Sequence, residues 1–182
     1  HQSHSMLSGM AGPWNGTGNE TIVSDLQRIL SEIEATCGNR FTYYDSCLHG
    51  IDHLREVALL AGEIATRMGQ DVEAAMVAGF LHDCGRVDDG GGRQHAIDSA
   101  VIARPVLEEC FPHLDADKIC DAIARHADGE ITEDPIAGAL WDADRLTLTR
   151  LCRDVREELL STPVAKEMLR KRRDVAASHP PD

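Results

Sequence analysis

Residues 80–86 read Phe-Leu-His-Asp-Cys-Gly-Arg and place an imidazole beside a carboxylate at the end of an apolar run. Successive residues of a helix point in directions about 100° apart. His82 and Asp83 can therefore converge on one site only where the helix ends, and Gly85 places that end correctly. Imidazole and carboxylate are the ligand types that suit borderline or hard divalent metals. This stretch predicts a metal site at the end of a helix.

Three further candidate ligands lie on the apolar faces of other predicted helices. His53, His126 and Asp144 each fall in line with the apolar residues of a different helix. Taken singly, each histidine would be a hydrogen-bonded core residue, and each aspartate a buried ion pair or a helix cap. A buried polar group without a partner is costly. Because four helices would point such groups into one core, a shared metal site is the better explanation.

The two aspartates at 142 and 144 differ in the face that they occupy. Asp142 shares its face with Arg145 and Thr149, so we expect it on the solvent side or behind the ligands. Asp144 shares its face with the core. We therefore choose Asp144 as the metal ligand.

The periodicity is helical nearly throughout, and no stretch alternates for long enough to predict a strand. The predicted helices span about 19–37, 51–68, 71–82, 95–110, 115–126, 134–160 and 163–173. A chain of 182 residues can bury one full core. We expect an all-α, single-domain bundle of about six or seven helices over 19–173. A tag remnant and flexible arm (1–18) would precede it, and a flexible tail (174–182) would follow.

Composition bears on the compartment and the partner. No apolar run approaches the roughly 18 residues of a membrane span, and no signal peptide is visible. Six cysteines without a C-x-x-C pair fit a reducing cytoplasm, so we expect a cytoplasmic protein without a membrane partner. The formal net charge of −13 argues against a nucleic-acid polymer as partner, because backbone binding needs clustered Lys and Arg. A small anionic substrate stays open, because divalent cations and a few arginines reverse the potential locally.

Three motifs together resemble the HD superfamily of metal-dependent phosphohydrolases. They read LHGIDHLREV at 48–57, LHDCGR at 81–86 and DADRL at 142–146, and the resemblance covers roughly residues 45–155. It implies an HD-domain-like helical bundle. The ligands that it implies for a first metal are His53, His82, Asp83 and Asp144.

His95 and His126 go beyond that minimal set and resemble the extra histidine pair of binuclear members. The resemblance implies a second metal held by these two histidines and by Asp83, which would bridge both ions. If His95 is instead a surface residue at a helix start, the site is mononuclear. The metals would be divalent ions, two of them, drawn from Fe, Mn, Co, Ni, Zn or Mg.

The resemblance implies a phosphohydrolase, either a phosphomonoesterase or a phosphodiesterase. A bound metal lowers the pKa of water, and two metals about 3.5–4 Å apart clamp the attacking and leaving oxygens. We expect metal-activated water to cleave a phosphoester of a small phosphorylated metabolite or nucleotide, with Asp83 as a catalytic residue. Arg86 and Arg93 flank a Gly-rich loop and are candidate phosphate contacts through their guanidinium donors, or else exposed loop charges.

Two other functions stay open from the sequence. HD-like oxygenases use a mixed-valence di-iron centre and O₂ to cleave C–C or C–P bonds, and the six ligands resemble theirs as well. A nucleotide- or metal-sensing module without turnover is the non-enzymatic alternative. The basic run at 170–173 is a solvated face by default, or else part of a homo-oligomer interface.

Overall fold

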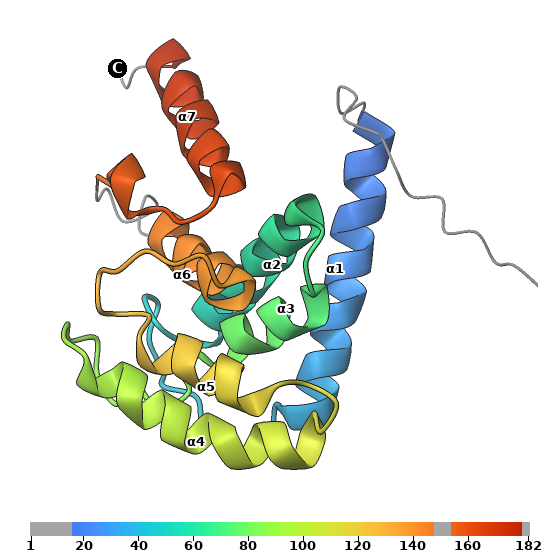
Figure 1. Ribbon diagram of the computed structural model, residues 1–182, viewed down its shortest axis with the longest axis vertical. Coiled ribbons are helices and arrows are strands. Elements are labelled where there is room, and N and C mark those ends of the chain that lie inside the picture. Colours follow the sequence, from blue (N-terminus) through green and yellow to red (C-terminus); the bar gives the residue numbers. More distant parts are fainter. Residues whose placement is uncertain (1–15, 148–153, 180–182) are drawn as a thin grey trace, which may run out of the picture.

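The computed structural model describes residues 16–147 and 154–179, and all regular structure within these ranges is helical (Figure 1). The elements are α1 (Gly16–Cys37), α2 (Ile51–Met68), α3 (Val72–Leu81), α4 (Gln94–Cys110), α5 (Ala116–Ala124), α6 (Pro135–Thr147), the short 3-10 helix η2 (Glu157–Leu159) and α7 (Pro163–Ser178). The predicted all-α fold class is confirmed.

Helices α2 and α3 form the centre of the bundle (Figure 1). Gly69 ends α2 with a φ of 65°, a left-handed conformation that glycine adopts without strain. Asp71 then caps α3 by accepting a hydrogen bond from the Ala74 amide at 3.0 Å. This short connection folds α3 back onto α2.

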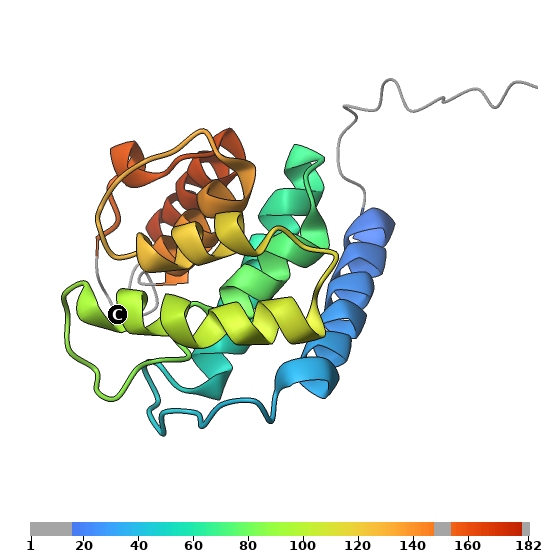
Figure 2. The same cartoon turned by 60° about the horizontal axis from the view of Figure 1, so that its bottom comes forward.

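The other helices surround this central pair. α1 packs along one side, α4 and α5 lie side by side across one end, and α6 covers α2, α3 and α5 (Figures 1 and 2). Residues 74–81 of α3 are all buried, as expected for a helix that is apolar all round. The carboxyl end of α3 is therefore a point where several helices meet, and His82-Asp83 follows directly after it.

The sixth helix differs from the prediction that it reaches residue 160. The described part of α6 ends at Thr147, residues 148–153 lie outside the described ranges, and the chain from 154 to 160 contains only η2. A continuous helix would carry Ser161 about 28 Å from Asp142, at about 1.5 Å per residue. The Ser161 amide instead donates to Asp142 Oδ1 at 2.7 Å, so the chain turns back onto α6.

The ends of the bundle also extend beyond their predicted limits. α1 begins at Gly16, ahead of the predicted boundary at 19, and α7 continues to Ser178, past the start of the predicted flexible tail at 174. The rest of the predicted arm (1–15) and tail (180–182) lies outside the described residues. The domain boundaries stay a prediction.

Candidate metal centre

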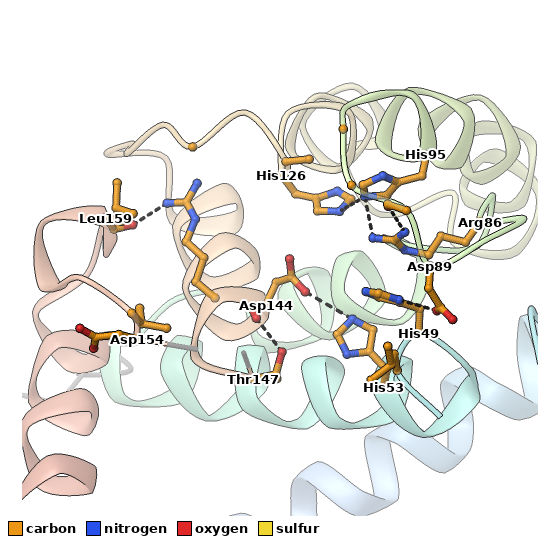
Figure 3. Close-up of a pocket in the computed structure, with 18 residues that line it drawn as sticks. His49, His53, Arg86, Asp89, His95, His126, Asp144, Thr147, Asp154 and Leu159 are labelled. Carbon is orange, nitrogen blue, oxygen red and sulfur yellow. Dashed lines mark hydrogen bonds and ion pairs between the residues drawn. The ribbon is translucent and has the colours of Figure 1, made fainter. Parts of the chain in front are cut away.

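The fold brings all six predicted ligands to one place near the carboxyl end of α3. Figure 3 shows His53, His95, His126 and Asp144 around the pocket. They come from different elements: His53 from α2, His82 and Asp83 from the end of α3, His95 from the first turn of α4, His126 from the end of α5, and Asp144 from α6. His53, His82, Asp83 and His126 are buried, and the other two are partly exposed. The site is thus a convergence of five helices.

Four ligand atoms form a first set. His53 Nε2 lies 3.2 Å from His82 Nε2 and 3.5 Å from Asp83 Oδ2. Asp144 Oδ1 lies 3.3 Å from both imidazole nitrogens, and His82 Nε2 lies 3.4 Å from Asp83 Oδ2. Ligands about 2.0–2.2 Å from a shared metal are separated by roughly these distances in tetrahedral or octahedral geometry. The first set fits one divalent ion.

Three ligand atoms form a second set around the other oxygen of Asp83. Asp83 Oδ1 lies 3.3 Å from His126 Nε2 and 3.6 Å from His95 Nε2. The two imidazole nitrogens lie 3.2 Å apart. Asp83 therefore offers one carboxylate oxygen to each set, as a ligand that bridges two ions would.

Backbone carbonyls orient two of the imidazoles. His82 Nδ1 donates to the Gly79 carbonyl at 2.6 Å, and His126 Nδ1 donates to the Ile123 carbonyl at 2.7 Å. Each carbonyl belongs to the last turn of a helix, where carbonyl groups lack a helical partner. A donating Nδ1 turns Nε2 toward the cluster, which is the second hydrogen bond typical of metal-bound histidine.

The electrostatics also fit a cation. Burial alone raises the pKa of Asp83, but the adjacent imidazoles, His82 foremost, hold it well below its usual range. Hydrogen bonds from His53 and His82 likewise outweigh burial and lower the pKa of Asp144. Asp83 Oδ1 is buried without a hydrogen-bond partner among the described residues, which is costly unless a cation lies there. The residues present thus fit divalent metal binding.

The histidines differ in their charge state. Burial lowers the pKa of His82, but Asp83 and Asp144 outweigh it and raise that pKa to about 10. Burial and then the Arg86 guanidinium lower the pKa of His95 to about 4. A metal ion at the first set would therefore replace a proton on His82, whereas His95 already has a free lone pair.

The two predicted phosphate contacts lie in different surroundings. Arg86 lines the pocket above the cluster, and its guanidinium donates to Asp83 Oδ2 at 3.0 Å. Arg93 pairs with Asp128 at 3.2 Å, and its side chain is 67% exposed and does not line the pocket. The phosphate contact of either arginine stays a prediction.

Of the two positions expected for Asp142, the solvent side is wrong. Asp142 is fully buried, and its carboxylate accepts hydrogen bonds from the Ser161 and Thr162 amides and from the Thr162 hydroxyl.

Arg145 follows the ligand Asp144 and donates to the Leu159 carbonyl at 2.5 Å. It is buried in the pocket wall.

A pocket of about 430 Å³ opens onto the cluster. His53, His95, His126 and Asp144 contribute to its base, and the Gly-rich residues 90–92 line its wall. His49 also lines it, with Nδ1 2.8 Å from Asp89 Oδ1 (Figure 3). No local sequence pattern indicates this contact, because Asp89 is 40 residues away along the chain.

Comparison with known proteins identifies the family. Residues 50–170 match the family model of the HD domain, which is more than half of the chain. The chain belongs to the HD domain family. A solved structure that it resembles is that of a predicted HD superfamily hydrolase from an uncultured Thermotogales bacterium. That protein is 25% identical, with a TM-score of 0.59 and with 91% of this chain and 94% of that chain covered.

Sequence relatives carry a more specific name. Ribonuclease Y of Chlorobium chlorochromatii (strain CaD3) is 32% identical over 136 residues, which is 73% of this chain and 24% of that protein. Ribonuclease Y of Chlorobium phaeovibrioides (strain DSM 265 / 1930) is 34% identical over 138 residues, 74% of this chain and 25% of that protein. This HD-domain chain therefore spans about a quarter of the length of these relatives.

These findings confirm the HD superfamily, support a metal-dependent hydrolase and correct the predicted partner. A small phosphorylated substrate without a nucleic-acid partner is contradicted, because the relatives are ribonucleases. The exclusion of a nucleic-acid polymer rested on the net charge, which sums over the whole surface and does not describe the potential at one site. None of the helices in the described ranges has the length and apolar composition of a membrane span.

Proposed function

We propose that this HD domain hydrolyses phosphodiester bonds of RNA with divalent metal ions. The observation that carries the proposal is the position of Asp83, whose two oxygens each face a separate set of histidines at the base of an open pocket. The name of the ribonuclease relatives supports RNA as the substrate class.

The first ion would be held by His53, His82, Asp83 and Asp144, and a second by Asp83, His95 and His126. When bound, such ions act as Lewis acids toward phosphoryl oxygens and lower the pKa of water. The carbonyl bonds of His82 and His126 keep both imidazoles in place for this role. The identity and number of the ions belong to the proposal.

Arg145 would bind a phosphate oxygen of the RNA backbone. It lines the same pocket as Asp144, and the Leu159 carbonyl holds one of its terminal nitrogens. The other terminal nitrogen, Nη2, has no hydrogen-bond partner in the described part of the chain. Because a guanidinium binds phosphate through paired N–H donors, a phosphodiester in the pocket would satisfy Arg145.

The test is cleavage of a labelled single-stranded RNA by chelated protein to which Mn²⁺, Co²⁺, Mg²⁺, Zn²⁺ or Fe²⁺ is added back. We expect metal-dependent cleavage with and without O₂. Asp83→Ala should abolish it, and Asp117→Ala, an exposed aspartate of α5, should leave it unchanged. Metal-loaded protein that leaves RNA intact would refute the proposal. Iron-dependent O₂ consumption under these conditions would favour the di-iron oxygenase instead.

A further inference from the structure

We propose that Arg86 is a built-in competitor of the second metal ion. The centre then binds one ion tightly and takes a second only when the Arg86 guanidinium withdraws. The inference rests on the proposed metal centre and goes beyond it, because it assigns the two ligand sets different affinities.

The guanidinium of Arg86 is fully engaged by groups around the cluster. Nε donates at 3.0 Å to Asp83 Oδ2, the oxygen that faces the first set. Nη2 donates to His95 Nε2 of the second set at 3.2 Å (Figure 3). Nη1 donates to the Gly90 carbonyl at 2.9 Å and is 3.3 Å from the Asp88 carbonyl. The side chain is 7% exposed. Arg86 is therefore held at the cluster by four contacts and is not a mobile surface charge.

Competition is direct at His95. Arginine has only donor groups, so His95 Nε2 must accept this hydrogen bond with its single lone pair. The same lone pair is the one that would bind a metal. The guanidinium and the second ion therefore exclude each other at His95.

The opposing nitrogen of His126 also favours a cation there. His126 Nδ1 donates to the Ile123 carbonyl, so in the neutral imidazole Nε2 presents a lone pair, 3.2 Å from that of His95. Two lone pairs at this distance repel one another unless a positive group lies beside them. Arg86 supplies that charge to the second set, as a metal ion would.

The first set is affected less, although Arg86 Nε donates to its Asp83 Oδ2. A carboxylate oxygen has two lone pairs, so Oδ2 can accept this bond and still bind an ion. The set also contains Asp144, and Arg86 contacts neither of its histidines. The second set shares the single charge of Asp83, which the Arg86 guanidinium neutralises. A divalent ion entering the second set would meet this unit positive charge at close range, where Coulomb repulsion is large. We therefore expect unequal affinities.

Withdrawal of Arg86 would also change the pocket. The Gly90 carbonyl would lose its Arg86 contact, and residues 90–92 line the pocket wall. Binding of the second ion is thus coupled to the anchoring of this loop.

The test is the metal content of chelated protein after equilibrium dialysis against a series of Mn²⁺ concentrations, measured by elemental mass spectrometry. For the wild type we expect one ion per chain first, and a second only at Mn²⁺ concentrations at least about tenfold higher. Arg86→Gln should bind two ions over one concentration range. The matched control is Arg104→Gln, an exposed arginine of α4, which should behave as the wild type.

His95→Ala in the wild-type background provides a second arm if Arg86→Gln fails to fold. It should remove the weak second phase and leave the first unchanged. Two ions of equal affinity in the wild type would overturn the role of Arg86 and leave the proposed hydrolase intact. A folded Arg86→Gln variant that still binds only one ion per chain would also overturn the role of Arg86 and leave the proposed hydrolase intact. Protein that binds no Mn²⁺ in any variant would overturn the metal centre itself.

Discussion

Replacing Asp142 by alanine removes the link between α6 and the start of α7. The carboxylate accepts three hydrogen bonds, from the Ser161 amide at 2.7 Å and from the Thr162 amide and hydroxyl at 2.8 Å each. Thr162 Oγ1 in turn accepts from the Ala165 amide at 3.1 Å and caps α7. Because Asp142 lies two residues before Asp144, the same link holds a metal ligand in place.

The magnitude follows from these contacts. Hydrogen bonds to a charged group contribute about 1.5–3 kcal/mol each. Burial raises the pKa of Asp142 despite these bonds, so part of their gain is spent on keeping the charge buried. Three bonds at the lower end of this range would contribute about 4.5 kcal/mol, and the cost of burial reduces the expected loss in the free energy of unfolding to about 3–4 kcal/mol. For a domain of this size, the melting temperature should fall by about 6–15 °C.

The assay is urea unfolding followed by circular dichroism at 222 nm, with chelator present so that metal binding does not contribute. Asp117→Ala is the control, because its side chain is 87% exposed and its removal should change stability by less than about 0.5 kcal/mol. A loss below about 1 kcal/mol in Asp142→Ala would show that this carboxylate does not hold α7 to α6.

Four further outcomes are expected. Asp83→Ala should bind no metal at concentrations that saturate the wild type, and full occupancy in that variant would contradict the assignment of the bridging ligand. Metal at a hundred times its dissociation constant should stabilise the fold by about 2.7 kcal/mol, so chelation should lower the melting temperature by about 5–10 °C; an unchanged value would count against a metal centre. Gly79→Ala should destabilise the fold by about 1–3 kcal/mol, because a Cβ there would lie 2.8 Å from Ala58 Cα, and a neutral effect in urea unfolding would mean that α2 and α3 separate freely. Asp71→Ala should cost about 1 kcal/mol through loss of the bond to the Ala74 amide, and a wild-type midpoint in the same assay would show that the cap is dispensable.

The sequence predicted those parts of the molecule that depend on local signals. Gly69 and Asp71 mark the end of α2 and the start of α3, and both boundaries agree with the structure. His53 lies on the apolar face of α2, which is why its inward direction could be read from spacing alone. Such signals extend over one or two helical turns and need no knowledge of the partner helix.

The parts that escaped prediction depend on contacts between distant segments. Asp142 is buried because residues 161 and 162 return to it, and nothing within one helical turn of Asp142 indicates this. The partners of Arg86 were equally hidden, since His95 is nine residues away across a Gly-rich loop. The formal charge of −13 wrongly argued against nucleic acid, because a net charge carries no information about how the charges are distributed.

The carbonyl bonds of His82 and His126 mean that these two ligands also complete the ends of α3 and α5. Selection for a well-terminated helix would retain both imidazoles even in a descendant that no longer binds metal. His53 and Asp144 have no such second task, because their side-chain hydrogen bonds and ion pairs in the described residues lead to other ligands. In a related chain, loss of His53 or Asp144 is therefore the earlier sign of an inactive centre, whereas a surviving His-Asp pair alone is weak proof of catalysis.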